Sequence, residues 1–200
     1  MLRYDRTRHV RQRSFSLTVT DVYADGAEQG LLGIAFSPNW VKDRWCYFYH
    51  TQNSPRNNVV VRYRIMRDGS GNYSASSGEM VLPGIPTSGY HNGGHLVFDG
   101  SGNLMISTGD AQTSSNAQSL TSLADKVLRI RPNASSPGYI IPPGTSFGND
   151  ASRRREIWCW GLRNPWSIDQ EMHTTRFYIG DVSASGDEEI NDGSTYANFG

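Results

Sequence analysis

The sequence predicts an all-β protein, and three observations support that fold class. Glycine accounts for 21 of the 200 residues and aromatic residues for 11%, a composition more typical of loop-rich β proteins than of helix bundles. Short apolar stretches alternate with polar residues at the period of a strand, with turn-forming residues between them. A strand-turn-strand unit also recurs along the chain. This recurrence favours a β-propeller over the alternative of a β-sandwich.

The first half of the chain contains three predicted strands and one hairpin loop. Alternating or aromatic stretches place the strands at residues 13–22, 44–51 and 59–66. Residues 68–78 are rich in glycine, serine and asparagine, and we expect them to form the hairpin loop that follows.

The second half continues the pattern with strands that are short and apolar. We expect these strands at residues 96–98, 104–107, 126–131, 156–160 and 176–180. Two long loops separate them. Residues 111–121 are serine-rich and too weakly periodic for a helix, and a second loop begins at the Pro-Pro-Gly of residues 142–144.

Self-comparison shows that the chain repeats one unit. Residues 95–110 align without a gap over residues 166–181, and both segments end in Gly-Asp. Residues 33–51 have the same plan with a longer turn. These three imperfect copies of apolar strand, turn and second strand are spaced as propeller blades with inserted loops.

The overall charge excludes some classes of partner. The formal net charge is zero, so the protein has no field that gathers nucleic acid, and no apolar run is long enough to span a membrane. Five arginines between Arg3 and Arg13 form a local basic patch. Because no aromatic residues interleave them, we interpret the patch as a solvated strand edge rather than as a nucleic-acid arm. The same stretch lacks the apolar centre of a signal peptide.

The two cysteines, Cys46 and Cys159, both lie in aromatic strand-like runs. A disulfide needs Cα atoms within about 7 Å, which sequence alone does not establish. Two buried free thiols are the interpretation that we favour.

The best candidate for chemistry is the stretch YHNGGHLVFDGSGNLMISTGD, residues 90–110. It places His91 and two glycines before a short strand, so that a titratable imidazole sits at the end of a strand pair. An imidazole there can act as a general base, or it can simply cap the strand end. His91 and His95 do not predict a zinc site, because their spacing suits a helix and the glycines between them favour a loop.

Six landmarks in order resemble the soluble glucose/sorbosone dehydrogenase family of quinoprotein aldose sugar dehydrogenases. They are EQGLLGIAFSP, HNGGHLVFDGSGNLMISTGD, KVLRIRPN, IIPPGTSF, EIWCWGLRNPW and IGDVSASGDEEIN. The resemblance implies a six-bladed propeller of which this chain holds about three to four blades. It also implies one domain, residues 1–200, that is incomplete at both ends.

The resemblance implies a function for several residues. His91 matches the catalytic base, and Arg163 matches a residue that is both catalytic and cofactor-binding, since a guanidinium stabilises a quinone that gains negative charge. Asn164 matches a second contact to the cofactor. Glu28 stands where relatives have a glutamine that contacts the sugar. Gln29 is adjacent, and which of the two faces the site is open.

The implied cofactors are pyrroloquinoline quinone and Ca²⁺. In relatives, backbone carbonyl groups hold the calcium, and the matching positions here are Ser183 and Ala184, where relatives usually carry glycine. The acidic side chains of residues 187–189 offer a second ion site, although a solvated acidic loop is the interpretation that we favour. His95 departs from the arginine or glutamine of the family, and we expect a structural role for it.

The resemblance leaves two functions to compare. The first is oxidation of an aldose at its anomeric C1 hydroxyl, with base-assisted hydride transfer to the quinone and an external electron acceptor. An extracytoplasmic location goes with it. The second is a non-catalytic binding propeller like the hedgehog-interacting relatives. His91 and the Arg163–Asn164 pair favour the first, because a pure scaffold needs neither.

Overall fold

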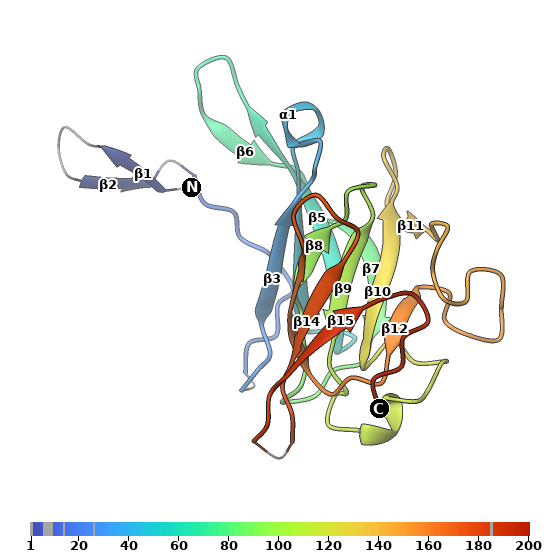
Figure 1. Cartoon of the computed structure of the whole chain (residues 1–200). Helices are drawn as coiled ribbons and strands as arrows, with labels where there is room; N and C mark the ends of the chain where they lie inside the picture. The colour runs from blue at the N-terminus through green and yellow to red at the C-terminus, as the bar shows by residue number, and fades with distance from the viewer. Residues whose placement is uncertain (1, 6–9, 14, 26, 185) are drawn as a thin grey trace.

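Three antiparallel sheets follow one another along the chain and stack side by side (Figure 1). The computed structural model describes residues 2–5, 10–13, 15–25, 27–184 and 186–200, with side chains from residue 15 onward. An N-terminal hairpin of β1 (Leu2–Asp5) and β2 (Val10–Arg13) projects away from the sheets. The basic patch between Arg3 and Arg13 lies there, and its side chains lie outside the described residues.

The first sheet has four main strands, and a short fifth strand pairs with the end of the longest one. The main strands are β3 (Leu31–Phe36), β4 (Trp45–Gln52), β5 (Asn57–Arg67) and β7 (Glu79–Ile85). A four-residue helix, α1 (Trp40–Asp43), lies in the turn between β3 and β4. The segment predicted as a plain loop after β5 also contains β6 (Tyr73–Ala75), which pairs with the end of β5.

The second and third sheets repeat this plan with shorter strands. The second contains β8 (Leu96–Phe98), β9 (Leu104–Thr108), β10 (Lys126–Pro132) and β12 (Ile157–Trp160), with β11 (Tyr139–Ile140) pairing with the end of β10. The third contains β13 (Pro165–Gln170), β14 (Phe177–Asp181) and β15 (Glu189–Gly193). The serine-rich loop after β9 holds one 3₁₀ turn, Ser114–Asn116. Neither this turn nor α1 is long enough to cross a membrane, and the described residues contain no longer helix.

The three predicted copies are the inner hairpins of the three sheets. They correspond to β3–β4, β8–β9 and β13–β14, and β8 lies against both β3 and β13. The self-comparison therefore identified the repeating unit correctly.

The strand predicted at residues 13–22 is wrong. Residues 15–20 form no strand, and Val22 makes only a single bridge to Gln52. The exposure of the side chains does alternate along this segment. Leu17 and Val19 are partly buried and pack on the first sheet against its apolar side chains. Alternation predicted which side chains are covered but not whether the backbone pairs, since both arrangements have the same two-residue period.

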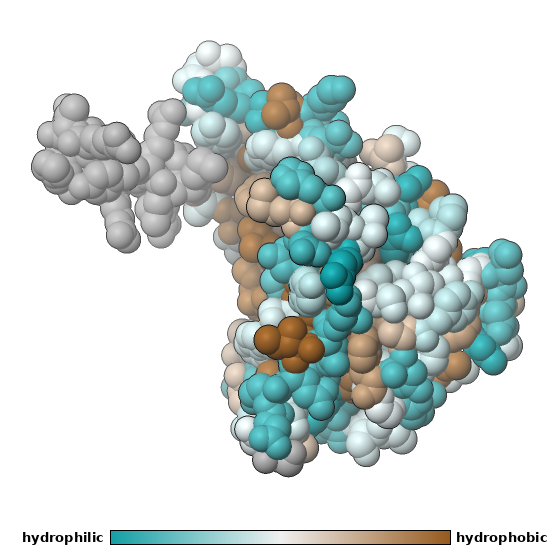
Figure 2. Space-filling model, in the orientation of Figure 1, coloured by the Kyte–Doolittle hydropathy of each residue, from teal (hydrophilic) through white to brown (hydrophobic). Residues whose placement is uncertain are grey.

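The core lies between the sheets, and adjacent side chains of β9 pack into two different hydrophobic clusters. Leu104 and Ile106 pack between the first and second sheets, whereas Met105 packs between the second and third. All five residues of β9 are buried, which is expected of a strand enclosed on both faces. The inner strand β3 keeps Leu31, Ile34 and Phe36 half-exposed, and hydrophobic residues gather on that face in Figure 2.

Both cysteines are buried free thiols, as predicted. Burial raises the pKa of Cys46 to about 12 and also raises the pKa of Cys159. Since the thiolate is the reactive form, neither side chain is suited to redox or nucleophilic chemistry in the folded chain.

Candidate active site

One end of the three stacked sheets gathers the polar side chains of the candidate site. In an antiparallel hairpin the start of the first strand and the end of the second strand meet at the same edge. Glu28 precedes β3, His91 precedes β8 and Arg163 precedes β13, whereas Asp110 follows β9 and Asp181 ends β14. The repeat therefore brings residues that are far apart in sequence to one place.

The backbone of His91 is held in a left-handed conformation. Its φ is 58°, which is uncommon for a residue other than glycine. The Oε2 atom of Glu28 accepts a 2.6 Å hydrogen bond from the His91 N–H, and the His91 carbonyl accepts one of 3.1 Å from the N–H of Ala111. These contacts hold the backbone of His91 in its strained conformation. Backbone strain that is maintained by surrounding contacts is typical of functional positions.

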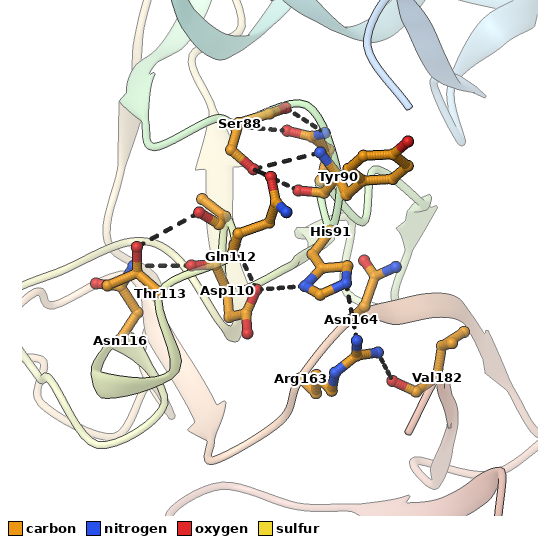
Figure 3. Close-up of polar contacts among 12 residues, drawn as sticks. Ser88, Tyr90, His91, Asp110, Gln112, Thr113, Asn116, Arg163, Asn164 and Val182 are labelled. Atoms are coloured by element: carbon orange, nitrogen blue, oxygen red, sulfur yellow. Dashed lines mark hydrogen bonds and ion pairs between the residues drawn. The ribbon is translucent and has the colours of Figure 1, made fainter. Parts of the chain in front are cut away.

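The imidazole of His91 joins two neighbouring sheets (Figure 3). Its Nδ1 lies 2.8 Å from Oδ1 of Asp110, and its Nε2 lies 2.9 Å from Nη2 of Arg163. A guanidinium can only donate, so Nε2 must accept, and the ring proton must be on Nδ1 and point to the carboxylate. The geometry thus assigns a neutral imidazole with its lone pair on Nε2, covered by Arg163.

Arg163 contacts the loop after β14 as well as His91. Its Nη1 donates to the carbonyl oxygens of Val182, at 2.8 Å, and Ser183, at 3.0 Å. The carboxylate of Asp181 fixes the start of β13 by accepting from the backbone N–H groups of Arg163, at 2.8 Å, and Asn164, at 2.7 Å. Burial raises the pKa of Asp181, and these two N–H groups oppose the rise.

Asn164 links the second and third sheets instead of pointing freely into the site. Its Oδ1 accepts from the N–H of Gly93 at 3.0 Å, and only 2% of the residue is exposed. The neighbouring Asn92 is equally buried and bonds to Thr87, to the backbone at Ser88 and to the carbonyl of Glu28. The amide side chains of Asn92 and Asn164 therefore both fix the loop that presents His91.

The structure brings together His91, Arg163, Asn164 and Glu28 but turns Gln29 elsewhere. Glu28 contacts the backbone of His91, whereas Nε2 of Gln29 donates to Thr87 at 3.2 Å. His95 has the expected structural contact, since its Nδ1 accepts from the N–H of Ile168 in the third sheet at 3.2 Å. Burial lowers the pKa of His95.

The residues expected to hold calcium do not form a ready ion site. The carbonyl of Ser183 is an oxygen donor of the kind that calcium prefers, but it accepts from Arg163. A calcium ion at that carbonyl would lie beside the guanidinium, and the two positive charges repel each other, so this contact disfavours calcium. Ala184 follows in the same loop. The described residues also contain no cluster of three or more His, Cys, Asp or Glu side chains arranged for a metal, and residues 187–189 are exposed.

Sequence reasoning missed Asp110 and Asp181 as members of the site. Both are the aspartates of the two Gly-Asp ends that self-comparison had aligned. Recurrence of an aspartate at the same corner was the available signal, because an acid that becomes buried at a strand end needs a donor nearby. One carboxylate holds an imidazole and the other holds a backbone turn.

A large hollow lies elsewhere, with a volume of about 1190 Å³ beside residues 141–150. Its aromatic walls are Phe147, Trp160 and Tyr196, and neither His91 nor Arg163 lines it. The imidazole and guanidinium instead occupy the open end of the stacked sheets.

The glucose/sorbosone dehydrogenase family model matches residues 3–200 of this chain. The aldose sugar dehydrogenase YliI of Escherichia coli is 29% identical over 185 residues, covering 91% of this chain and 48% of that protein. The mouse hedgehog-interacting protein is 27% identical over 168 residues, covering 77% and 24%.

A solved structure shows the same fold. The PQQ-bound form of the aldose sugar dehydrogenase from Streptomyces coelicolor superposes with a TM-score of 0.80 at 25% identity, covering all of this chain and 55% of that one. The chain thus spans about half the length of the dehydrogenases that it matches. With the three stacked sheets, this likeness confirms the prediction of a partial β-propeller.

Proposed function

Because this chain belongs to the glucose/sorbosone dehydrogenase family, we propose that it carries the catalytic-base part of a quinoprotein sugar dehydrogenase site. The reaction is oxidation of an aldose at its anomeric C1 hydroxyl. The observation that supports it is the contact of His91 Nε2 with Arg163 Nη2, which places a base and a fixed cation 2.9 Å apart on neighbouring blades. An external electron acceptor and an extracytoplasmic location are parts of the same proposal.

The role of His91 follows from its tautomer. Asp110 holds the Nδ1 proton, so Nε2 keeps the lone pair that accepts the proton of the sugar hydroxyl. Asp110 also stabilises the imidazolium that forms, as a buried carboxylate does for a catalytic histidine in other enzymes. Because Arg163 covers Nε2 in this structure, the guanidinium must turn away before the base can act.

Arg163 is the residue that would contact pyrroloquinoline quinone, and Asn164 fixes the strand that carries it. When bound, the quinone supplies the hydride acceptor that no amino-acid side chain provides. A guanidinium that moved to an anionic quinone would leave His91 Nε2 uncovered, so one movement would prepare both parts of the site. The same movement would free the Ser183 carbonyl, and this carbonyl together with Ala184 would then hold the calcium.

We assign sugar binding to Glu28 rather than to Gln29. One carboxylate oxygen of Glu28 holds the His91 backbone, and the described hydrogen bonds do not engage its Oε1. A carboxylate beside the base is suited to accept a bond from a sugar hydroxyl. Gln29 is bound to Thr87 and stays a weaker candidate.

A second function, binding of a protein partner without catalysis, is favoured by one observation. The carbonyl assigned to calcium is occupied by a guanidinium, and a scaffold like the hedgehog-interacting protein needs no such ion. The two functions differ in whether the chain binds the quinone at all.

Titration of the chain with pyrroloquinoline quinone and calcium, followed by quinone absorbance, tests the proposal. We expect Arg163→Met to weaken binding about 10- to 100-fold, because a charge-assisted hydrogen bond contributes about 1.5–3 kcal/mol. We expect His91→Gln to keep binding but to lose reduction of the bound quinone by aldoses about 10²- to 10⁴-fold.

The matched control is Arg155→Met, which removes an exposed guanidinium far along the loop before β12. It should bind as the parent chain does. Equal affinity of the Arg163→Met and parent chains would refute the assignment of Arg163, and a parent chain that binds no quinone would favour the protein-binding function.

A further inference from the structure

Asp125 is a buried acid without a partner, directly beneath the candidate site. None of its side chain is exposed, and neither carboxylate oxygen has a hydrogen-bond partner in the described structure. Its backbone is left-handed, with φ of 64°, and its N–H bonds to the carbonyl of Gly109, beside the Gly-Asp corner of β9. A buried polar group without a partner is costly, so its presence needs an explanation.

The charges around Asp125 explain which form it adopts. The charged groups that act on its carboxyl are Lys126, Asp110, Asp181 and Arg163. With all of these groups ionised and His91 neutral, the carboxylates outnumber the cations by one. A buried excess charge is unfavourable, so one acid should hold a proton.

Asp125 is the acid best placed to hold that proton. Asp110 bonds to His91 and to the N–H of Gln112, and Asp181 accepts two backbone N–H groups, which favour its ionised form. Lys126 offers the carboxylate of Asp125 no hydrogen bond, because its ammonium donates to backbone carbonyls, that of Asp125 included. Burial raises the pKa of Asp125 to about 8.

We infer that Asp125 is a positioning residue that controls whether Arg163 is free for the cofactor. As a neutral acid it leaves the guanidinium at the surface of the site, and as an anion it draws the guanidinium back toward the fold. The inference rests on the proposed function. It sets an upper pH limit for cofactor binding by Arg163, because Asp125 becomes an anion above that pH. Its evidence is the burial of Asp125, its two unpartnered carboxylate oxygens and the charged groups around it.

The ¹³C resonances of Asp125 Cγ and Arg163 Cζ, followed from pH 5 to 9 in the chain without cofactor, test the inference. Arginine does not titrate in this range, so an inflection of Cζ reports a neighbour. We expect both resonances to inflect together on the alkaline side of pH 7. Asp125→Asn should abolish the inflection of Arg163, and the exposed control Glu171→Gln should keep it.

Two results would contradict the inference. An Asp125 Cγ that titrates below pH 5, or an Arg163 inflection that persists in Asp125→Asn, overturns the inference. If Asp125→Asn fails to fold, Asp125→Gly serves, since glycine adopts the left-handed backbone without strain. Because no quinone is present, failure of this test is separate from failure of the quinone titration.

Discussion

Replacing Gly109 with alanine is expected to destabilise the chain by about 3 kcal/mol, at the upper end for overpacking a tight site. A Cβ on Gly109 would lie 2.2 Å from the carbonyl oxygen of His91 and 2.7 Å from Oδ1 of Asn164. The nearer atom is backbone, so it cannot turn aside. The substitution therefore forces apart the loop that carries the base and the strand that carries the guanidinium.

Urea unfolding at neutral pH measures the loss through the transition midpoint at unchanged slope. The control is Gly100→Ala, in the turn between β8 and β9, where an added Cβ meets nothing within 4 Å. It should change stability by no more than about 0.5 kcal/mol. If the two variants unfold at the same urea concentration, the close approach of the two blades at Gly109 is wrong.

Replacing Lys126 with methionine should cost about 3–5 kcal/mol. The ammonium is fully buried and donates to the carbonyl oxygens of Asn116, Ala117, Ala124 and Asp125 at 2.7–3.2 Å. Methionine fills a similar volume but leaves those carbonyls without their donor. The loop that these carbonyls belong to begins just after Asp110, so its loosening also disturbs the partner of His91.

Lys42 provides the matched control, since the chain has only these two lysines. It lies exposed on α1, and Lys42→Met should leave stability within about 0.5 kcal/mol of the parent. Hydrogen exchange gives a second measurement: amides of residues 113–119 should exchange faster in Lys126→Met alone. If the amides of residues 113–119 are equally protected in the two variants, the hydrogen bonds of the Lys126 ammonium do not hold this loop in place.

Much of the fold could be predicted from the sequence because the repeat is local. The aligned Gly-Asp ends identified the second and third inner hairpins, aromatic and apolar runs predicted β4 and β5, and alternation predicted β10. Pairing is not local, which is why residues 13–22 were misjudged. Alternation there reports packing onto a sheet rather than membership of one.

The site could be predicted only in part for a similar reason. His91, Arg163 and Asn164 stand in recognisable motifs, and the structure places them together. Asp125 has no motif, and its importance depends on burial beside two other acids. The contact of Ser183 with Arg163 depends on which loops meet, and that is fixed by the stacking of blades.

The most direct test of the account is ¹⁵N NMR of the His91 ring and the Arg163 guanidinium in the chain before and after addition of pyrroloquinoline quinone and calcium. We predict a ring protonated on Nδ1, with Nε2 as an acceptor, in the free chain. On addition, Nε2 should move toward the shift of an unbonded acceptor as the Arg163 resonances change over the same titration. A free ring protonated on Nε2, or side chains that saturating quinone leaves unmoved, would contradict the shared site of base and cation.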